Sequence, residues 1–139
     1  MTAHVVEPGE LETIEILGPT IQYVTEPDGD EAGPCVMRGS VPAGVDVGLH
    51  SHADPETFLI EAGDIEAFDG SRWLRLGPGD VFHVPGDETH GFRNASNEPA
   101  VMHIVSTVRM GRFFREVAGA TPDQFVAVAE RYGHTVGLE

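Results

Sequence analysis

The sequence predicts an all-β fold, a barrel or sandwich of short strands, followed by a helical C-terminal end. The first observation is the high content of turn residues, with 17 Gly and 10 Pro in 139 residues. These residues interrupt the chain too often for long helices and favour short strands. The second is a series of short runs in which apolar and polar residues alternate, as in half-buried strands. Beyond residue 110, the apolar residues take up the spacing of a helix instead.

Ten segments have the composition of strands and are separated by turn residues. They are residues 11–17, 20–26, 35–42, 45–52, 56–61, 64–68, 71–76, 81–85, 90–94 and 100–108. The dipeptide Asp69-Gly70 lies between two of them and favours a two-residue hairpin. The acidic, glycine-rich segment 27–34 predicts a loop.

The C-terminal residues predict one or two short helices. Residues 112–119 form the first, which ends at Gly119. The second begins at Thr121, because this N-cap is followed by Pro and, three residues later, by Gln. Gly133 suits its C-terminal end. One face of this helix is apolar and is expected to pack against the exterior of the barrel; it contains Phe125, Val128, Ala129 and Tyr132.

Composition excludes several classes of protein. The formal net charge of −15 argues against nucleic-acid partners and anionic membranes, both of which attract basic surfaces. Cys35 is the only cysteine, so no internal disulfide can form. The N-terminus has no apolar core typical of a signal peptide, and no apolar run approaches the ~20 residues of a membrane helix. We therefore expect a soluble cytoplasmic protein.

Two stretches contain residues that are typical metal ligands. In the first, His50 and His52 are two residues apart, so in an extended strand their imidazoles point to the same face. Pro55 interrupts the strand, and Glu56 opens the next run, so one hairpin can deliver two imidazoles and a carboxylate to one point. The second stretch contributes His90. Such a ligand set suits Fe, Mn, Ni, Co, Cu or Zn and leaves positions open for water or substrate.

The spacing of these residues resembles the two motifs of the cupin superfamily. The first motif, G-x5-H-x-H-x3-E-x6-G, is matched by Gly44, His50, His52, Glu56 and Gly63. The second, G-x5-P-x-G-x2-H-x3-N, is matched by Gly79, Pro85, His90 and Asn94. It departs from the family at one position, because Asp87 stands where the motif has Gly and Gly86 comes one residue early.

The resemblance implies a fold, a set of domains and a metal site. The fold is the cupin double-stranded β-helix, or jelly-roll barrel, with the short C-terminal helices added to it. The chain then divides into a flexible arm (1–10), a barrel (11–110) and a helical extension (111–139). His50, His52, Glu56 and His90 are the implied ligands of one divalent metal. Because small cupins commonly pair through their early strands, segment 11–26 also suggests a homodimer.

Four residues are expected to form the substrate pocket. Phe58 and Ile60 share the strand face of Glu56, Phe92 shares the face of His90, and His103 lies on the last strand. The direction of His103 is undetermined, because its strand is apolar on both faces, and a structural role is equally compatible with the pattern. His134, near the C-terminus, is expected to be solvated.

Three hypotheses for function remain open. The order of segments ETFLIEAGDIEAFDG, WLRLGPGD, VPGDETHGFRN and RFFREVAG resembles bacterial cupins similar to quercetin dioxygenases. That resemblance implies a dioxygenase for a phenolic or enolic substrate such as a flavonol or diketone. Glu56 would be both ligand and catalytic base, taking a proton from the enol before it reacts with O2. The alternatives are a non-redox isomerase, lyase or polyketide cyclase, and a module that binds a small molecule without converting it.

Overall fold

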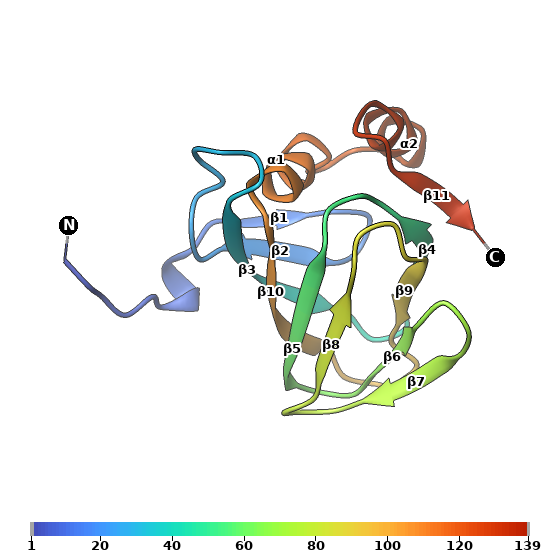
Figure 1. Cartoon of the computed structure of the whole chain (residues 1–139). Coiled ribbons are helices and arrows are strands. Elements are labelled where there is room, and N and C mark those ends of the chain that lie inside the picture. Colours follow the sequence, from blue (N-terminus) through green and yellow to red (C-terminus); the bar gives the residue numbers. More distant parts are fainter. Residues whose placement is uncertain (1, 139) are drawn as a thin grey trace.

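A computed structural model describes residues 2–138, which form two antiparallel sheets and two C-terminal helices (Figure 1). The first sheet contains, in spatial order, β1 (Thr13–Glu15), β2 (Thr20–Tyr23), β3 (Pro34–Val41), β10 (Ala100–Thr107), β5 (Glu56–Ala62) and β8 (Val81–Val84). The second contains β11 (Thr135–Leu138), β4 (Asp46–Ser51), β9 (His90–Arg93), β6 (Ile65–Phe68) and β7 (Trp73–Leu76). The predicted all-β jelly-roll architecture is confirmed.

Alternating burial along the strands shows which side chains face the space between the sheets. In β10 the residues from Ala100 to Ile104 alternate between buried and partly exposed, and β3 follows the same pattern. Buried Met37, Phe58 and Met102 belong to a hydrophobic core that includes residues of both sheets. The burial pattern therefore identifies the inward residues of β10, which the sequence alone does not, because this strand is apolar on both faces.

The connection from β4 to β5 differs from its predicted form. These two strands do not form a hairpin, because β4 pairs with β9 and β11 whereas β5 pairs with β10 and β8. The residues around Pro55 carry the chain from one sheet to the other. The metal-ligand candidates on either side of this crossing therefore face each other across the barrel.

One further connection corrects the sequence analysis. The turn between β6 and β7 spans four residues rather than two, since Phe68 pairs with Trp73. Asp69 stabilises it by accepting hydrogen bonds from the backbone N–H groups of Ser71 and Arg72. Of the early strands, β2 pairs with β1 on one side and with β3 on the other, so that β1 is the edge strand of the first sheet.

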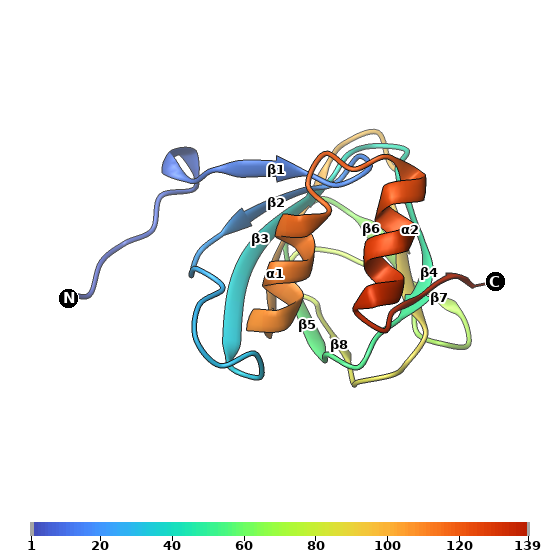
Figure 2. The same ribbon diagram turned by 90° about the horizontal axis from the view of Figure 1, so that it is seen from above.

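The C-terminal helices lie side by side over the two sheets (Figure 2). Helix α1 (Val108–Glu116) begins four residues earlier than expected, because Thr107 at the end of β10 caps it by accepting a hydrogen bond from Met110 N. Helix α2 (Pro122–Arg131) has the capping box predicted at Thr121. Its expected apolar face is also confirmed, with Ala129 in the core and Phe125, Val128 and Tyr132 packed against it.

The chain then returns as β11, which the sequence analysis missed. This short strand pairs with the outer edge of β4, next to His50 (Figure 1). Before β1, a 3-10 turn (Pro8–Glu10) follows an exposed N-terminal segment that extends away from the sheets (Figure 2). Within residues 2–138, no helix combines the length and apolar character needed to cross a membrane.

Candidate metal centre

Four side chains from three strands and one loop meet between the sheets. His50 lies on β4, His52 directly follows this strand, Glu56 begins β5 and His90 begins β9. One ligand atom from each lies within 4.8 Å of the ligand atoms of the other three. His50 and His90 are also direct partners in the β4–β9 ladder, which sets their rings 4.3 Å apart. The structure therefore brings together the four residues expected to bind a metal.

Hydrogen bonds to the backbone orient all three imidazoles. Nδ1 of His50 lies 2.7 Å from Gly48 O, Nδ1 of His52 lies 2.8 Å from Asp54 O, and Nδ1 of His90 lies 2.9 Å from Glu88 O. A carbonyl can only accept, so each Nδ1 donates a proton to the backbone, and each ring turns its Nε2 toward the other members of the cluster. Metal-binding histidines are usually oriented in this way.

Glu56 lies between the Nε2 atoms of His52 and His90. Its Oε1 atom is 2.9 Å from Nε2 of His52 and 3.3 Å from Nε2 of His90. Burial alone would raise the pKa of this carboxyl, but the two imidazoles outweigh burial and lower the pKa to about 2. Glu56 is therefore ionised at neutral pH, as a metal ligand must be.

The two histidines of the first motif have opposite pKa shifts. Burial, assisted by nearby His90, lowers the pKa of His50 to about 4. Burial also disfavours the charged form of His52, but contact with the Glu56 carboxylate outweighs it and raises the pKa. The two histidines differ in this way because His52 lies directly against the carboxylate of Glu56.

The donor set fits a divalent metal. Nε2 of His52 is fully buried and, despite its closeness to Glu56, makes no hydrogen bond with the residues the structure describes. A buried nitrogen left in this way costs free energy unless something binds it. A cation held by the three Nε2 atoms and by Oε1 of Glu56 would bind all four of these ligand atoms. The donors suit several first-row metals without selecting one.

The departure from the second motif has a clear structural cause. Asp87, which replaces the motif Gly, has a φ of 68°, the left-handed conformation that Gly adopts freely and Asp tolerates. Its N–H donates to His52 O at 2.7 Å, so the turn supports a metal ligand. Gly86 is required for another reason, because a Cβ there would collide with Ala53 O. The shifted glycine thus preserves the turn before His90.

Asp54 links the metal centre to the C-terminal part of the chain. Its backbone carbonyl accepts from His52, while its carboxylate accepts from Thr107 Oγ1 at 2.6 Å and Arg109 Nη1 at 3.1 Å. Arg109 also donates to Tyr132 O at 2.6 Å and lies over the Tyr132 ring. The position of His52 is therefore connected to α1 and to the end of α2.

A mainly apolar cavity of about 670 Å³ reaches from this cluster to the C-terminal helices. Its size is within the roughly 300–1,000 Å³ of small-molecule sites. His50, Glu56 and His90 line it, together with Phe113 and Phe125 of the helices. The expectation that α2 packs on the barrel exterior is thus corrected, because the helices form a wall of the cavity.

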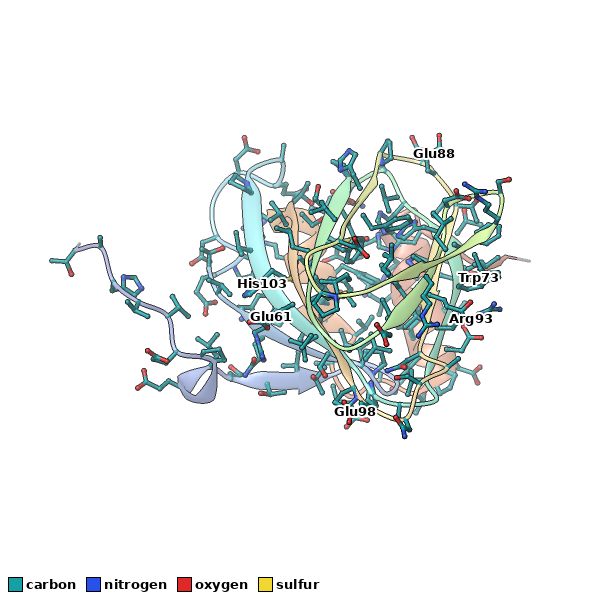
Figure 3. The ribbon with its side chains drawn as sticks, turned by 90° about the horizontal axis from the view of Figure 1, so that it is seen from below. Glu61, Trp73, Glu88, Arg93, Glu98 and His103 are labelled. Carbon is teal, nitrogen blue, oxygen red and sulfur yellow. The ribbon has the colours of Figure 1, made fainter. Side chains whose placement is uncertain are left out.

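Two of the four expected pocket residues line this cavity, and two do not. Phe58 and Phe92 line it, with their rings 4.7 Å apart. Ile60 is buried in the core but away from the cavity wall. His103 faces the opposite side of its strand, near Glu61 in Figure 3. Its neighbours Met102 and Ile104 have the inward positions and line the cavity in its place.

The sequence analysis also missed His134. We expected this residue to be solvated, but it is only 7% exposed, and its ring lies 4.9 Å from that of His52. It follows α2 and lines the cavity. No signal in the sequence identifies it, because its position depends on the path of the C-terminal segment.

A double-stranded barrel with three histidines and one glutamate between its sheets defines the cupin class of metal-site protein. The family model for the cupin domain matches residues 37–106, which include both motifs. The chain therefore belongs to the cupin family. A comparison with curated protein sequences finds no match.

Solved structures with the same fold include proteins of different activities. The polyketide cyclase RemF from Streptomyces resistomycificus is 14% identical, with 91% of this chain and 99% of that chain covered and a TM-score of 0.67. An RmlC-like cupin from Shewanella frigidimarina is 17% identical, with coverage of 81% and 96% and a TM-score of 0.66. A predicted oxalate decarboxylase from Thermotoga maritima is 23% identical, with coverage of 75% and 98% and a TM-score of 0.64. At these identities the likeness shows the fold alone.

Proposed function

We propose that this cupin is a metal-dependent dioxygenase that acts on a mainly apolar phenolic or enolic compound. The observation that carries the proposal is the His50–His52–Glu56–His90 cluster, which lies at the wall of an apolar cavity. The cavity suits an aromatic or multi-ring body, and the cluster suits an oxygen function on it. The chemistry that a bound divalent metal supplies here is Lewis acidity, which lowers the pKa of an enol or phenol.

Glu56 is the proposed base. Both of its imidazole contacts use Oε1, and neither uses Oε2. The second oxygen is therefore available to take a proton from a compound that enters the cavity. Phe58 and Phe92, which line the cavity, provide an apolar surface for the body of the compound and exclude water around it. The deprotonated, electron-rich compound then reacts with dioxygen.

The test begins with the identity of the metal after native purification, measured by elemental analysis. The His50→Ala, His52→Ala double variant is the control and should contain much less metal. Oxygen uptake by the native protein is then screened with flavonols, diketones and aromatic polyketides. Equal metal content in the two proteins would reject the metal centre, and substrate conversion without oxygen uptake would reject the dioxygenase.

A second candidate is a non-redox polyketide cyclase. RemF, a polyketide cyclase whose fold matches 91% of this chain, is an example of a protein with this fold and that activity. In such an enzyme the metal site only polarises a carbonyl, so Zn would suffice and turnover would continue without oxygen. Anaerobic assays separate the two candidates. Binding without turnover under either condition would instead indicate a non-catalytic binding protein.

We also propose a cytoplasmic homodimer. The first sheet exposes apolar side chains on its outer face, including Leu59, Val81 and Val105, and a second copy could cover them. Light scattering at micromolar concentration measures the mass directly. A mass near the 14.9 kDa of one chain would contradict the dimer.

A further inference from the structure

The turn between β1 and β2 contains a leucine in a strained conformation. A hydrogen bond from Ile16 N–H to Pro19 O, 2.8 Å long, closes this hairpin. The two residues between them, Leu17 and Gly18, have φ values of 50° and 116°. Hairpin turns with two positive φ values favour Asn or Gly at the first position, because a larger side chain there crowds its own backbone. Leucine is therefore an unfavourable residue for this conformation.

Leu17 does not gain stability from packing either. It is 46% exposed, whereas its neighbour Ile16 is buried in the core. A leucine that neither suits its backbone conformation nor fills the core contributes little to the stability of the fold. Strained residues of this kind are concentrated at active sites and at sites that hold ligands. Leu17 and Pro19 line the cavity, so binding provides a role for this residue that stability does not.

Helix α2 contributes a second exposed apolar residue to the same cavity. Val126 is 39% exposed and lines the cavity. Of the large apolar residues that are exposed in the described part of the chain, Leu17 and Val126 are the two that line it. Their elements are tied together, since Gly119 N–H donates to Glu15 O at 2.9 Å. In Figures 1 and 2 the β1–β2 turn lies near the start of α2.

We propose that Leu17 and Val126 form an apolar clamp at the mouth of the cavity, which holds the part of the bound molecule farthest from the metal cluster. Phe58 and Phe92 line the cavity too but are buried, which places the exposed pair at its outer end. Contact of two apolar side chains with water is unfavourable, and an apolar tail that covers them removes it.

The ligand is then an elongated compound with an oxygen function at one end and an apolar tail at the other. The oxygen faces the metal cluster, and the tail reaches the clamp. That this compound is a substrate rests on the proposed function, whereas the contribution of the clamp to binding can be measured without turnover.

The test compares two probes that differ in the length of the tail. 4-Ethylphenol and 4-octylphenol have the same phenol group, and only the second has a long tail. Equilibrium dialysis measures their dissociation constants, and thermal unfolding measures stability. Leu17→Asn introduces a residue that the turn favours, and Val126→Thr keeps the shape of the side chain but makes it polar. Leu59→Asn is the matched control, because Leu59 is an exposed leucine on β5 that does not line the cavity.

We expect Leu17→Asn to change binding and stability in opposite directions. Binding of 4-octylphenol should weaken by about threefold to tenfold, because its tail loses an apolar contact, while 4-ethylphenol binding stays within about twofold. The midpoint of thermal unfolding should rise by about 2–6 °C, because Asn adopts a positive φ with less strain. Val126→Thr should weaken 4-octylphenol binding by about twofold to fivefold. Leu59→Asn should bind both probes like the native protein.

Several outcomes would overturn the inference. A lower unfolding midpoint for Leu17→Asn would make Leu17 a structural residue, and an equal loss for both probes would separate it from the tail. Unchanged binding of 4-octylphenol in either cavity variant would also reject the clamp, as would a native protein that does not prefer the longer probe. The proposed dioxygenase fails separately. Clamp-dependent binding without oxygen uptake by any screened compound rejects only the reaction, and oxygen uptake that is indifferent to both cavity variants rejects only the clamp.

Discussion

Replacement of Asp54 by Ala tests whether the C-terminal part of the chain holds the metal centre in place. Asp54 is 8% exposed, and its carboxylate accepts hydrogen bonds from Thr107 and Arg109. Both bonds involve a charged acceptor, and such bonds contribute about 1.5–3 kcal/mol each when buried. The Arg109 side chain is 30% exposed, so solvent screens part of its share. We expect Asp54→Ala to lower the free energy of unfolding by about 2–3 kcal/mol.

The same substitution should also weaken metal binding. The carbonyl of Asp54 accepts the Nδ1–H of His52, and the side-chain contacts hold this carbonyl in position. Loss of a residue that supports a metal ligand typically costs 10–100-fold in affinity. In Asp54→Ala the backbone hydrogen bond to His52 remains, and only the position of its carbonyl is less well fixed. We therefore expect a loss of metal affinity at the lower end of this range, about tenfold.

Chemical unfolding of the metal-free protein measures the first effect, and competition with a coloured chelator measures the second. Asp64→Ala is the matched control, since Asp64 forms an ion pair with Arg75 whose two side chains are 52% and 80% exposed. The control should change stability by less than about 0.5 kcal/mol and leave metal affinity unchanged. An Asp54→Ala protein that binds metal like the control would refute the positioning role.

Three further predictions concern the base, the turn and a buried tyrosine. Metal-saturated Glu56→Gln should bind substrate but lose roughly 10²–10⁴-fold in rate; near-normal turnover would exclude Glu56 as the base. Asp87→Gly should keep native metal affinity, whereas Gly86→Ala should lower both stability and metal affinity, because a Cβ collides with Ala53 O. Equal behaviour of the two variants in unfolding and metal titrations would contradict this account. Burial raises the pKa of Tyr23, whose hydroxyl donates to Gly111 O at 2.7 Å. Above pH 10 the unfolded chain therefore loses a proton that the folded chain keeps, and stability should fall by about 1.4 kcal/mol per pH unit. In urea unfolding measured at several alkaline pH values, Tyr23→Phe should reduce this loss of stability per pH unit. An unchanged loss would contradict its assignment to Tyr23.

Strand geometry predicted part of the ligand set, and the resemblance to the two cupin motifs implied the rest. Residues two apart on a strand share a face, so His50 and His52 had to present their rings together. The hairpin assigned to this region was nevertheless wrong. Alternation indicates which face of a strand is buried but not which sheet the strand joins, and β4 and β5 join different sheets. The four side chains meet in either arrangement, so the error did not affect their convergence.

The pocket was harder to predict than the cluster. Strand β10 is apolar on both faces, so the sequence contained no signal that Met102 faces inward and His103 outward. Its position between β3 and β5 determines that direction. His134 presented a different difficulty, because a residue close to the C-terminus is usually exposed. It is buried here because α2 packs on the core and β11 returns to pair with β4.

The cavity joins two parts of the chain that contribute different properties. Residues matched by the cupin model, 37–106, supply all four members of the metal cluster. Phe113, Phe125 and His134 lie beyond that range and form the opposite part of the cavity wall. Substitutions in the C-terminal segment can therefore change which compound fits while leaving the metal donors intact. The two parts are not fully independent, however, since the ion pair between Asp54 and Arg109 connects His52 to the segment that forms this part of the wall.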